Sequence, residues 1–383
     1  MNNDKIRILH IAHRITGKAD GVFKHLIMLF SLLDKQKFEQ FLIYSDDLEN
    51  VNSFISSLNI KVYPLPELNK KFPLIALGKI YGIVKKQKID IIHTHLVKPY
   101  LIAGLLNFSL KKKLIFNYHG AFIEEKFYNS FEMKILKKIH DFIINNNLVN
   151  MWIFPSKKLA QDIMNEYHLK INYKCYYNGY FNIDQSFFKD DSELLDNLNK
   201  LKRKYFLVGI IGRIDKWKRI DIALEVLRNL LDNGLHTVFV FIGDGENIKE
   251  MKNYALQLGI EKNALFFDFI PYISNKLSVF DLILITSEKE GFPLVIWEAM
   301  YNSVPIVSSD IGGIREILIK EKCGYVYPLY DIKACVEIIT ELFLNREILI
   351  QLGKNGRKAL EEKYNSKNFK EFFEKLYCDL LNE

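Results

Sequence analysis

Short apolar segments alternate with longer amphipathic segments along most of the chain. Apolar runs of this kind predict buried strands, and the segments between them have the periodicity of helices. In the first half the expected strands are residues 6–12, 39–45, 60–65, 90–95, 113–119 and 151–156. In the second half they are residues 205–212, 237–243, 264–270, 281–287 and 304–309, with helices expected from about residue 220, from about residue 246 and from Pro293.

This alternation is typical of parallel sheets that helices cover on both faces. The scheme lapses in the polar stretch 184–204 and then repeats. The sequence therefore predicts an α/β protein of two Rossmann-like domains, residues 1–190 and 205–365, which suits a length of 383 residues. A last helix, residues 366–383, opens at Ser366 and closes the chain. Its expected apolar face carries Phe369, Phe372, Phe373, Leu376 and Leu380.

Composition narrows the class of protein. With 49% hydrophobic and 13% aromatic residues, the chain is expected to be globular. Its four cysteines lie far apart without a CxxC pair, which argues against a disulfide framework and a zinc knuckle. The N-terminus lacks the features of a signal peptide, and no apolar run reaches about 18 residues. A cytoplasmic location is therefore expected.

The positive charge is concentrated in the first half. Residues 1–190 hold 27 lysines and arginines against 17 acids, whereas residues 191–383 hold 26 against 29. This asymmetry favours an anionic surface or ligand for the first domain. In the segment 131–142, apolar positions at helical spacing stand beside Lys134, Lys137 and Lys138. Such a helix suits an anionic bilayer or a lipid-linked pyrophosphate, but also an ordinary core helix with solvated lysines.

A Gly-Phe-Pro corner lies just after the expected strand 281–287. Gly291 lets the backbone approach a ligand closely, and Phe292 precedes Pro293 at the expected first helical position. The backbone N–H groups of Leu294 and Val295 would then point from a positive helix end, which favours phosphate.

Two carboxylates flank this corner. Glu298 is suited to accept two hydrogen bonds from the vicinal diol of a ribose, and Glu290 to hold hydroxyls of a second ring. The alternative is a helix-capping acid and a surface acid.

Basic residues follow another expected strand end. Gly212, Arg213 and Lys218 come directly after the strand 205–212, where the two cations can bind a departing diphosphate. The alternative is a solvated basic loop. Gly243 lies in a Gly-Asp-Gly turn after the next strand, a weak signal that completes neither a GxGxxG fingerprint nor a P-loop.

The first half offers a glycine loop and several histidines. Gly17 and Gly21 give room for a ligand, or only a flexible connection, and His119-Gly120 follows an expected strand. His93 and His95 alternate without a third ligand at suitable spacing, so no metal site is expected. The pair Asp190-Asp191 is interpreted as solvent-exposed.

These motifs together resemble family 4 of the GT-B glycosyltransferases. The similarity covers nearly the whole chain: the N-terminal glycine loop, HG at 119–120, NG at 178–179, GRxxxxK at 212–218, GDG at 243–245, and EGFPLVIWEAM followed by VPIVSSDIGG. Two positions depart from the family pattern, in which glycine is common: Asp20 precedes Gly21, and Arg219 follows Lys218.

The resemblance implies two Rossmann-like domains facing across a cleft, with the terminal helix returning to the first domain. The second domain would hold a nucleotide-diphosphate sugar, and the acceptor would enter from the first. Catalytic roles are implied for Arg213, Lys218, Glu290 and His119. Donor-binding roles are implied for Gly21, Gly212, Gly243, Gly291, Phe292, Pro293, Leu294, Val295 and Glu298.

The resulting hypothesis is a retaining glycosyltransferase without metal or cofactor. It would move a hexose-type residue to a hydroxyl of a glycan or a polyprenyl-diphosphate-linked acceptor, at the cytoplasmic membrane face, in surface polysaccharide biosynthesis. No nucleic-acid partner is expected. Two alternatives stay open: a nucleotide-sugar epimerase of the same fold, and a catalytically silent partner subunit that binds a nucleotide sugar.

Overall fold

The structure, a computed structural model, divides the chain into two units. The N-terminal unit comprises Met1–Asn178 with Ser366–Glu383, and the C-terminal unit comprises Gly179–Asn365. The described residues are 5–13, 21–45, 55, 57–70, 74–119, 131–177, 179–180, 192–270 and 273–382, without the side chains of 131–133 and 192. The division at 178/179 precedes the polar stretch 184–204, and the helix α7 (Ser192–Lys202) within that stretch belongs to the C-terminal unit.

The N-terminal unit is built on a seven-stranded parallel sheet in the order β3-β2-β1-β4-β5-β6-β7. Its strands are β1 (Ile6–Ala12), β2 (Phe38–Tyr44), β3 (Lys61–Pro64), β4 (Ile91–His95), β5 (Lys113–Asn117), β6 (Met151–Phe154) and β7 (Tyr173–Cys175). The first six correspond to expected strands. β7 was missed because it is a short, partly exposed edge strand without an apolar run.

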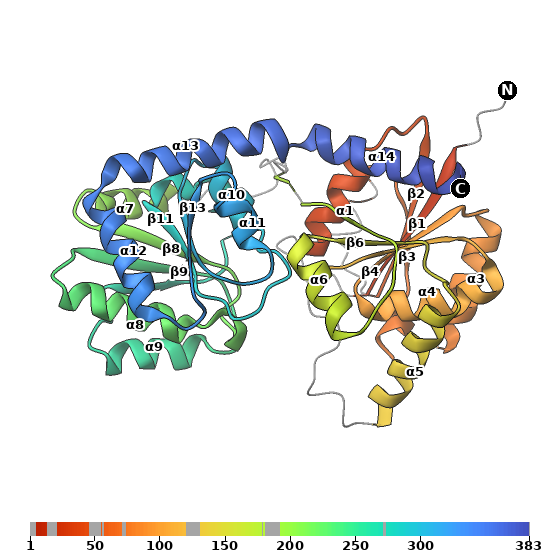
Figure 1. Ribbon diagram of the computed structural model, residues 1–383, viewed down its shortest axis with the longest axis horizontal. Helices are drawn as coiled ribbons and strands as arrows, with labels where there is room; N and C mark the ends of the chain where they lie inside the picture. The colour runs from red at the N-terminus through yellow and green to blue at the C-terminus, as the bar shows by residue number, and fades with distance from the viewer. Residues whose placement is uncertain are drawn as a thin grey trace. The chain divides into compact units, whose positions relative to one another are not determined.

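Helices cover this sheet on both faces (Figure 1). They are α1 (Gly21–Leu32), α3 (Leu74–Lys86), α4 (Val97–Leu110), α5 (Phe131–Asn145), α6 (Lys157–Glu166) and α14 (Ser366–Asn382), with a 3-10 turn at Pro66–Asn69. Side chains alternate along a strand, so Leu9 and Ile11 of β1 pack with α3 and α4 in one core. His10 faces the opposite side, where its ring contacts Phe30 of α1.

The terminal helix α14 belongs to the N-terminal unit. Its buried residues are Phe369, Phe373, Leu376, Tyr377 and Leu380. Phe372, expected on this face, is only half-buried and stacks on Tyr176 with ring centroids 4.4 Å apart. The backbone N–H of Asp34 donates to the carboxylate of Glu374 at 2.8 Å, which ties the helix to the end of α1.

The C-terminal unit repeats the plan with a six-stranded parallel sheet in the order β10-β9-β8-β11-β12-β13. Its strands are β8 (Phe206–Ile211), β9 (Thr237–Ile242), β10 (Ala264–Phe267), β11 (Leu282–Ile285), β12 (Ile306–Ser309) and β13 (Gly324–Tyr327). Besides α7, its helices are α8 (Ile220–Asp232), α9 (Ile248–Gln257), α10 (Val295–Tyr301), α11 (Ile314–Leu318), α12 (Ile332–Leu344) and α13 (Arg346–Lys363), with 3-10 turns at Lys216–Lys218, Ile273–Asn275 and Leu277–Val279.

Helices α8, α9 and α12 share one apolar core with this second sheet, and the start of α13 adds Leu349 and Leu352 to the same core. The prediction of two successive Rossmann-like domains is confirmed. In each sheet the strand order reverses between two neighbours, β1 and β4 in the first and β8 and β11 in the second. The carboxyl ends of the strands at such a switch point are where parallel sheets bind ligands.

Replacement of Phe373 tests how much α14 contributes to the N-terminal unit. Its ring is fully buried and lies against Phe369, His25 and Tyr377. Phe373→Ala is expected to lower the free energy of unfolding by about 3–5 kcal/mol, because it leaves a cavity that neighbours fill only in part. Urea unfolding followed by circular dichroism measures the change.

Leu74→Ala is the matched control, because that side chain is mostly exposed on α3. It is expected to change the free energy of unfolding by less than about 0.5 kcal/mol. Equal losses in both variants would show that α14 does not contribute to the core as described.

Candidate active site

The loops after β8 and β11 meet at the switch point of the C-terminal sheet. Gly212, Arg213 and Lys218 from the first loop line one pocket together with Ser287 and Val295 from the second. These loops follow neighbouring parallel strands, so their positions at one edge of the sheet are a direct result of the strand order. The pocket therefore brings together the basic loop and the start of α10, two motifs that lie far apart in the sequence.

Lys218 and Glu290 form an ion pair inside this region. Their side chains are 23% and 18% exposed, so water screens the pair only in part. The hydroxyl of Ser287 donates a second hydrogen bond to the same carboxylate oxygen at 3.0 Å. The backbone of Lys218 is fixed from the other loop as well, because Thr286 donates its hydroxyl to the Lys218 carbonyl at 2.8 Å. The cation and the acid are thus held by both loops.

Asp215 shapes the basic loop. Its carboxylate accepts the backbone N–H groups of Trp217 and Lys218 at 3.0 and 3.3 Å, which caps the short 3-10 turn before α8. Its other oxygen lies 2.9 Å from the guanidinium of Arg213. The Arg213 side chain is 78% exposed, so it lines the pocket from the solvent side, whereas Lys218 is largely enclosed.

Two glycines permit close backbone approach around the pocket. A Cβ on Gly243 would lie 2.0 Å from the carbonyl oxygen of Gly212, and the φ angle of Gly243 is +149°. A Cβ on Gly312 would lie 2.8 Å from the carbonyl oxygen of Glu290, at a φ of +61°. Side chains at these positions would push the strand-end loops apart, so the two glycines are required by the packing.

The Gly-Phe-Pro corner is anchored by aromatic stacking. The ring of Phe292 lies on the buried Trp297 with centroids 5.1 Å apart and an interplanar angle of 19°. Trp297 donates its backbone N–H to Leu294, and Ile296 donates to Pro293, so the chain turns at the expected proline. The α-helix itself begins at Val295.

Glu298 is more enclosed than a ligand at the rim of the sheet would be. Only 7% of Glu298 is exposed. The pKa of Tyr180 is raised mainly by the burial of its own hydroxyl and next by the negative charge of Glu298. Tyr180 stacks on Tyr301 with ring centroids 4.2 Å apart.

Arg219, a departure from the family pattern, is held by two acids. It pairs with Asp221 and with Glu288, which follows β11. The hydrogen bonds to Asp221 are the main cause of the raised pKa of Arg219. Its guanidinium also lies over the ring of Tyr330 at 5.0 Å. Arg219 therefore joins the two loops at the surface and is largely neutralised there.

Comparisons with known proteins agree with this arrangement. A family model described as Glycosyl transferases group 1 matches residues 191–359, and one described as Glycosyltransferase Family 4 matches residues 19–180. The chain belongs to the family 4 glycosyltransferases. The resemblance drawn from the sequence motifs is thereby confirmed.

The glycosyltransferase is similar to curated proteins along most of its length. It is 24% identical to the UDP-Gal:alpha-D-GlcNAc-diphosphoundecaprenol alpha-1,3-galactosyltransferase of Escherichia coli, over 99% of this chain and 98% of that protein. It is 23% identical to the N-acetyl-alpha-D-glucosaminyl L-malate synthase of Bacillus anthracis, over 82% of this chain and 80% of that one. The crystal structure of Anabaena HepE with UDP-glucose superimposes with a TM-score of 0.76 at 17% identity, over 98% and 100% of the two chains. This last likeness shows the GT-B fold.

Two of the expected site residues lie in the N-terminal unit of the glycosyltransferase. Gly21 is the first residue of α1, and His119 follows β5. His119 is held by the ring of His95 at 3.0 Å and by the side-chain amide of Asn117 at 3.1 Å. Burial, followed by the charge of His25, keeps the pKa of His119 well below its usual range, so the imidazole is neutral at pH 7.

Sequence reasoning missed Ser287, Thr286 and Asp215, which position the pair Lys218–Glu290. The only signal in the sequence was a hydroxyl or an acid close after an expected strand. Such residues are common in loops, so this signal does not distinguish a site residue. Gly17 and Gly120, and the pair Asp190-Asp191 that was interpreted as solvent-exposed, lie outside the described residues. The roles given to individual residues by the resemblance stay predictions.

Gly243→Ala tests the close approach of the two loops in the glycosyltransferase. The added Cβ would meet the Gly212 carbonyl, so we expect the C-terminal unit to lose about 1–3 kcal/mol of stability. Displacement of the loop that carries Lys218 is also expected to weaken nucleotide binding, measured by isothermal titration calorimetry with UDP, GDP and ADP.

Gly234→Ala separates the clash from backbone strain. Gly234 also has a positive φ, +78°, but a Cβ there would meet nothing within 4 Å. This variant should keep normal nucleotide affinity, and an equal loss of affinity in both variants would contradict the role of the Gly243–Gly212 approach.

Proposed function

We propose that this glycosyltransferase is a retaining, metal-independent enzyme. It transfers a hexose-type residue from a nucleotide-diphosphate sugar to a hydroxyl of a glycan or a lipid-linked acceptor in surface polysaccharide assembly. The observation that carries the proposal is the largely enclosed ion pair between Glu290 and Lys218, the latter lining the pocket at the switch point of the C-terminal sheet. It combines a cation for a diphosphate with an acid for sugar hydroxyls.

Lys218 is the main cation of the proposed leaving-group site. In the described structure its charge is balanced by Glu290, so a bound diphosphate has to replace that carboxylate at the ammonium group. Arg213 adds a second, more exposed positive charge at the same pocket. Positive side chains placed where phosphate charge develops stabilise the transition state in the way that a metal ion does elsewhere. This supports metal independence.

Glu290 takes its second role when Lys218 turns to phosphate. Its carboxylate stays hydrogen-bonded to Ser287, next to the corner that begins at Gly291. From there it accepts hydrogen bonds from hydroxyls of the donor sugar. The N–H groups of Leu294 and Val295 and the carboxylate of Glu298 are the proposed contacts for phosphate and ribose.

Retention of configuration follows, in this proposal, from front-face substitution. The diphosphate leaves from the same face on which the acceptor hydroxyl attacks, and a leaving phosphate oxygen takes the acceptor proton. Lys218 and Arg213 stabilise the negative charge on that leaving group. Burial keeps His119 neutral, and its catalytic role is the one that the resemblance implies.

The acceptor class is inferred from similarity and from charge. The relative in Escherichia coli is named for an acceptor linked to diphosphoundecaprenol. Helix α5 presents the exposed lysines Lys134, Lys137 and Lys138. Next to them Phe142 is partly exposed and contacts Phe108, which is 59% exposed on α4, with ring centroids 5.5 Å apart. Lysines around exposed aromatic rings suit an anionic membrane surface.

No helix in the described ranges combines the length and the apolar character needed to span a bilayer. We propose a peripheral association at the inner face of the cell membrane, where lipid-linked acceptors are reached from the cytoplasm.

Lys218→Ala is the sharpest test of the proposed chemistry. We expect kcat/KM to fall by roughly 30- to 1000-fold, the effect of about 2–4 kcal/mol of lost charge stabilisation. Arg213→Ala is expected to lose about tenfold, because its exposed charge is screened by water. Lys249→Ala, at an exposed lysine of α9 outside the pocket lining, is the matched control. Normal turnover in Lys218→Ala would refute the assignment.

The assay that supports this measurement also separates the alternatives. The purified protein is incubated with UDP-, GDP- and ADP-sugars, and products are followed by NMR. Free sugar of unchanged anomeric configuration with nucleoside diphosphate, at the same rate in EDTA and in MgCl₂, supports the proposal. An altered sugar still attached to its nucleotide supports the epimerase, and protection from melting without turnover supports a binding subunit.

Flotation with liposomes tests the membrane surface. Binding to anionic liposomes is expected to fall with salt and to weaken when Lys134, Lys137 and Lys138 are changed to Gln together, by about 1 kcal/mol per lysine. A control variant changes the exposed lysines Lys249, Lys262 and Lys354 to Gln. Equal binding of both variants, or equal binding to zwitterionic liposomes, would contradict a role for this helix.

A further inference from the structure

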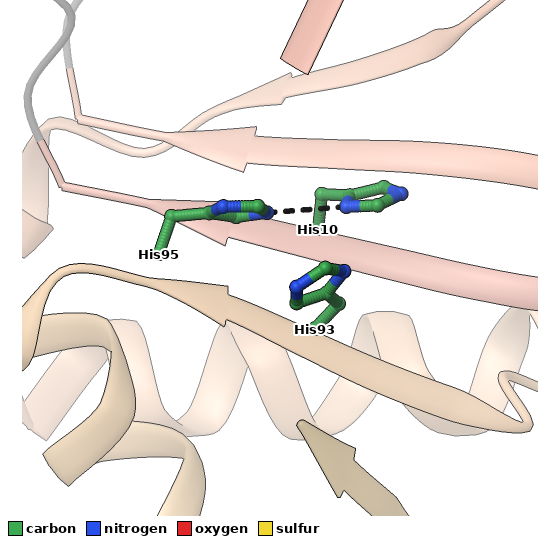
Figure 2. Close-up of side chains that lie close together, drawn as sticks. All are labelled: His10, His93 and His95. Carbon is green, nitrogen blue, oxygen red and sulfur yellow. Dashed lines mark hydrogen bonds between the residues drawn. The ribbon is translucent and has the colours of Figure 1, made fainter. Parts of the chain in front are cut away.

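Three histidines converge inside the N-terminal sheet, at its switch point. His10 of β1 is the register partner of His93 of β4, and His95 follows two residues later on the same face. All three side chains are fully buried. Figure 2 shows the rings of His10 and His95 end to end, with the ring of His93 beside their junction. The sequence offered only His93 and His95, and the strand order supplies the third member.

The ring nitrogens of this cluster are close enough for a single ion. One nitrogen from each histidine lies within 4.8 Å of the other two. Nδ1 of His10 and Nε2 of His95 are 3.3 Å apart. Two imidazoles bound to one tetrahedral zinc ion at about 2.1 Å have their nitrogens roughly 3.4 Å apart. The His93 nitrogen has to come to a similar distance from the other two to complete the set.

The outer nitrogens of the cluster are already taken. Gln40 donates its amide to the carbonyl of Leu29 at 3.1 Å, so its oxygen faces His10 and accepts from His10 Nε2 at 3.2 Å. The proton of a neutral His10 is therefore on Nε2, and Nδ1 presents a lone pair toward His95. Burial holds the pKa of His10 at about 3, so the neutral form is the one present at pH 7.

The outer ring nitrogens of His93 and His95 also have partners. Nδ1 of His93 lies 2.9 Å from the hydroxyl of Tyr377 on α14. Nδ1 of His95 lies 3.0 Å from His119 Nε2, which also receives the amide of Asn117. Metal-binding histidines typically use the outer nitrogen in this way, to fix the ring and its tautomer.

The inner nitrogen of His93 has no partner. Its Nε2 is buried and makes no hydrogen bond within the described part of the chain. A buried polar atom left in this state costs about 1–3 kcal/mol. Coordination to a cation removes that cost. The same cation would lie between the facing nitrogens of His10 and His95.

A second group, His25 with His95 and His119, also has ring nitrogens within 4.8 Å of one another. There the side-chain amide of Asn117 already fills the centre, because it lies 2.8 Å from His25 Nε2 and 3.1 Å from His119 Nε2. The first group has no such occupant among the described residues.

We propose that His10, His93 and His95 bind one d10 metal ion, Zn²⁺ or Cu⁺, which ties β1 to β4 beneath helix α14. Imidazole nitrogen suits both zinc and copper, and a d10 ion has no geometric preference that arises from its d electrons. No carboxylate or thiolate belongs to the group in the described residues, so a single positive charge is easier to bury there than a double one. The site is structural and separate from the pocket around Lys218.

The test uses full-length protein without a histidine tag. It is stripped with a chelator, loaded with Zn²⁺ or, under anaerobic reducing conditions, with Cu⁺, and desalted. Metal content is measured by mass spectrometry, and affinity by competition with a chromogenic chelator. We expect about one equivalent of bound ion and a raised melting temperature. His93→Ala should abolish the binding, whereas His236→Ala, at an exposed histidine, should keep it.

A conservative variant covers the case in which His93→Ala does not fold. Tyr377→Phe keeps the aromatic packing of α14 but removes the hydrogen bond to His93 Nδ1. It should weaken metal affinity by about 10- to 100-fold. The proposal is overturned if wild-type protein retains neither ion, if His93→Ala binds as much as wild type, or if Tyr377→Phe leaves the affinity unchanged.

Discussion

The geometry of the candidate site depends on the close approach of backbone segments at the carboxyl edge of the C-terminal sheet. The carbonyl of Gly212 occupies the space where any other residue at 243 would have a side chain. This approach brings the loop after β8 into contact with the loop after β9. Lys218, in the loop after β8, is directed toward the loop after β11. Glycine at these positions loses more conformational entropy on folding than another residue would, but it permits a backbone path that no other residue permits.

The two sheets use the same strand order and fill their switch points differently. In the C-terminal unit the point between β8 and β11 is a pocket whose lining includes the cations Arg213 and Lys218 and the hydroxyl residues Thr286 and Ser287. In the N-terminal unit the interior between β1 and β4 is filled by imidazoles that are linked to Gln40, Asn117 and Tyr377. Burial keeps these rings neutral, which makes them polar packing groups instead of charges. One topology thus provides a pocket lined by basic residues in one unit and a neutral polar layer in the other.

Most of the fold could be predicted from the sequence because long apolar strands and amphipathic helices leave a local signal. The edge strands β7 and β13 were missed, since their few, partly exposed residues have no such signal. The full burial of Tyr377 was missed because its place depends on contacts with β4 and β2, far away in the sequence.

The site was predictable to a similar degree. Glycines, cations and acids at strand ends were recognised one loop at a time, and the fold brings Lys218 to Glu290 as adjacent strands require. The third histidine was not recognised, because only the register of β1 against β4 places His10 beside His93. Strand register is a tertiary property that spacing within one segment does not reveal.

The assignment of α14 to the N-terminal unit has a consequence for biosynthesis. The C-terminal unit is one continuous stretch and can fold as soon as it leaves the ribosome. The N-terminal unit, although most of it is translated first, lacks Phe373 and Tyr377 of its core until α14 has been synthesised. Its histidine layer stays uncovered during elongation, so a nascent chain that stalls or terminates early exposes apolar surface and is a natural substrate for chaperones.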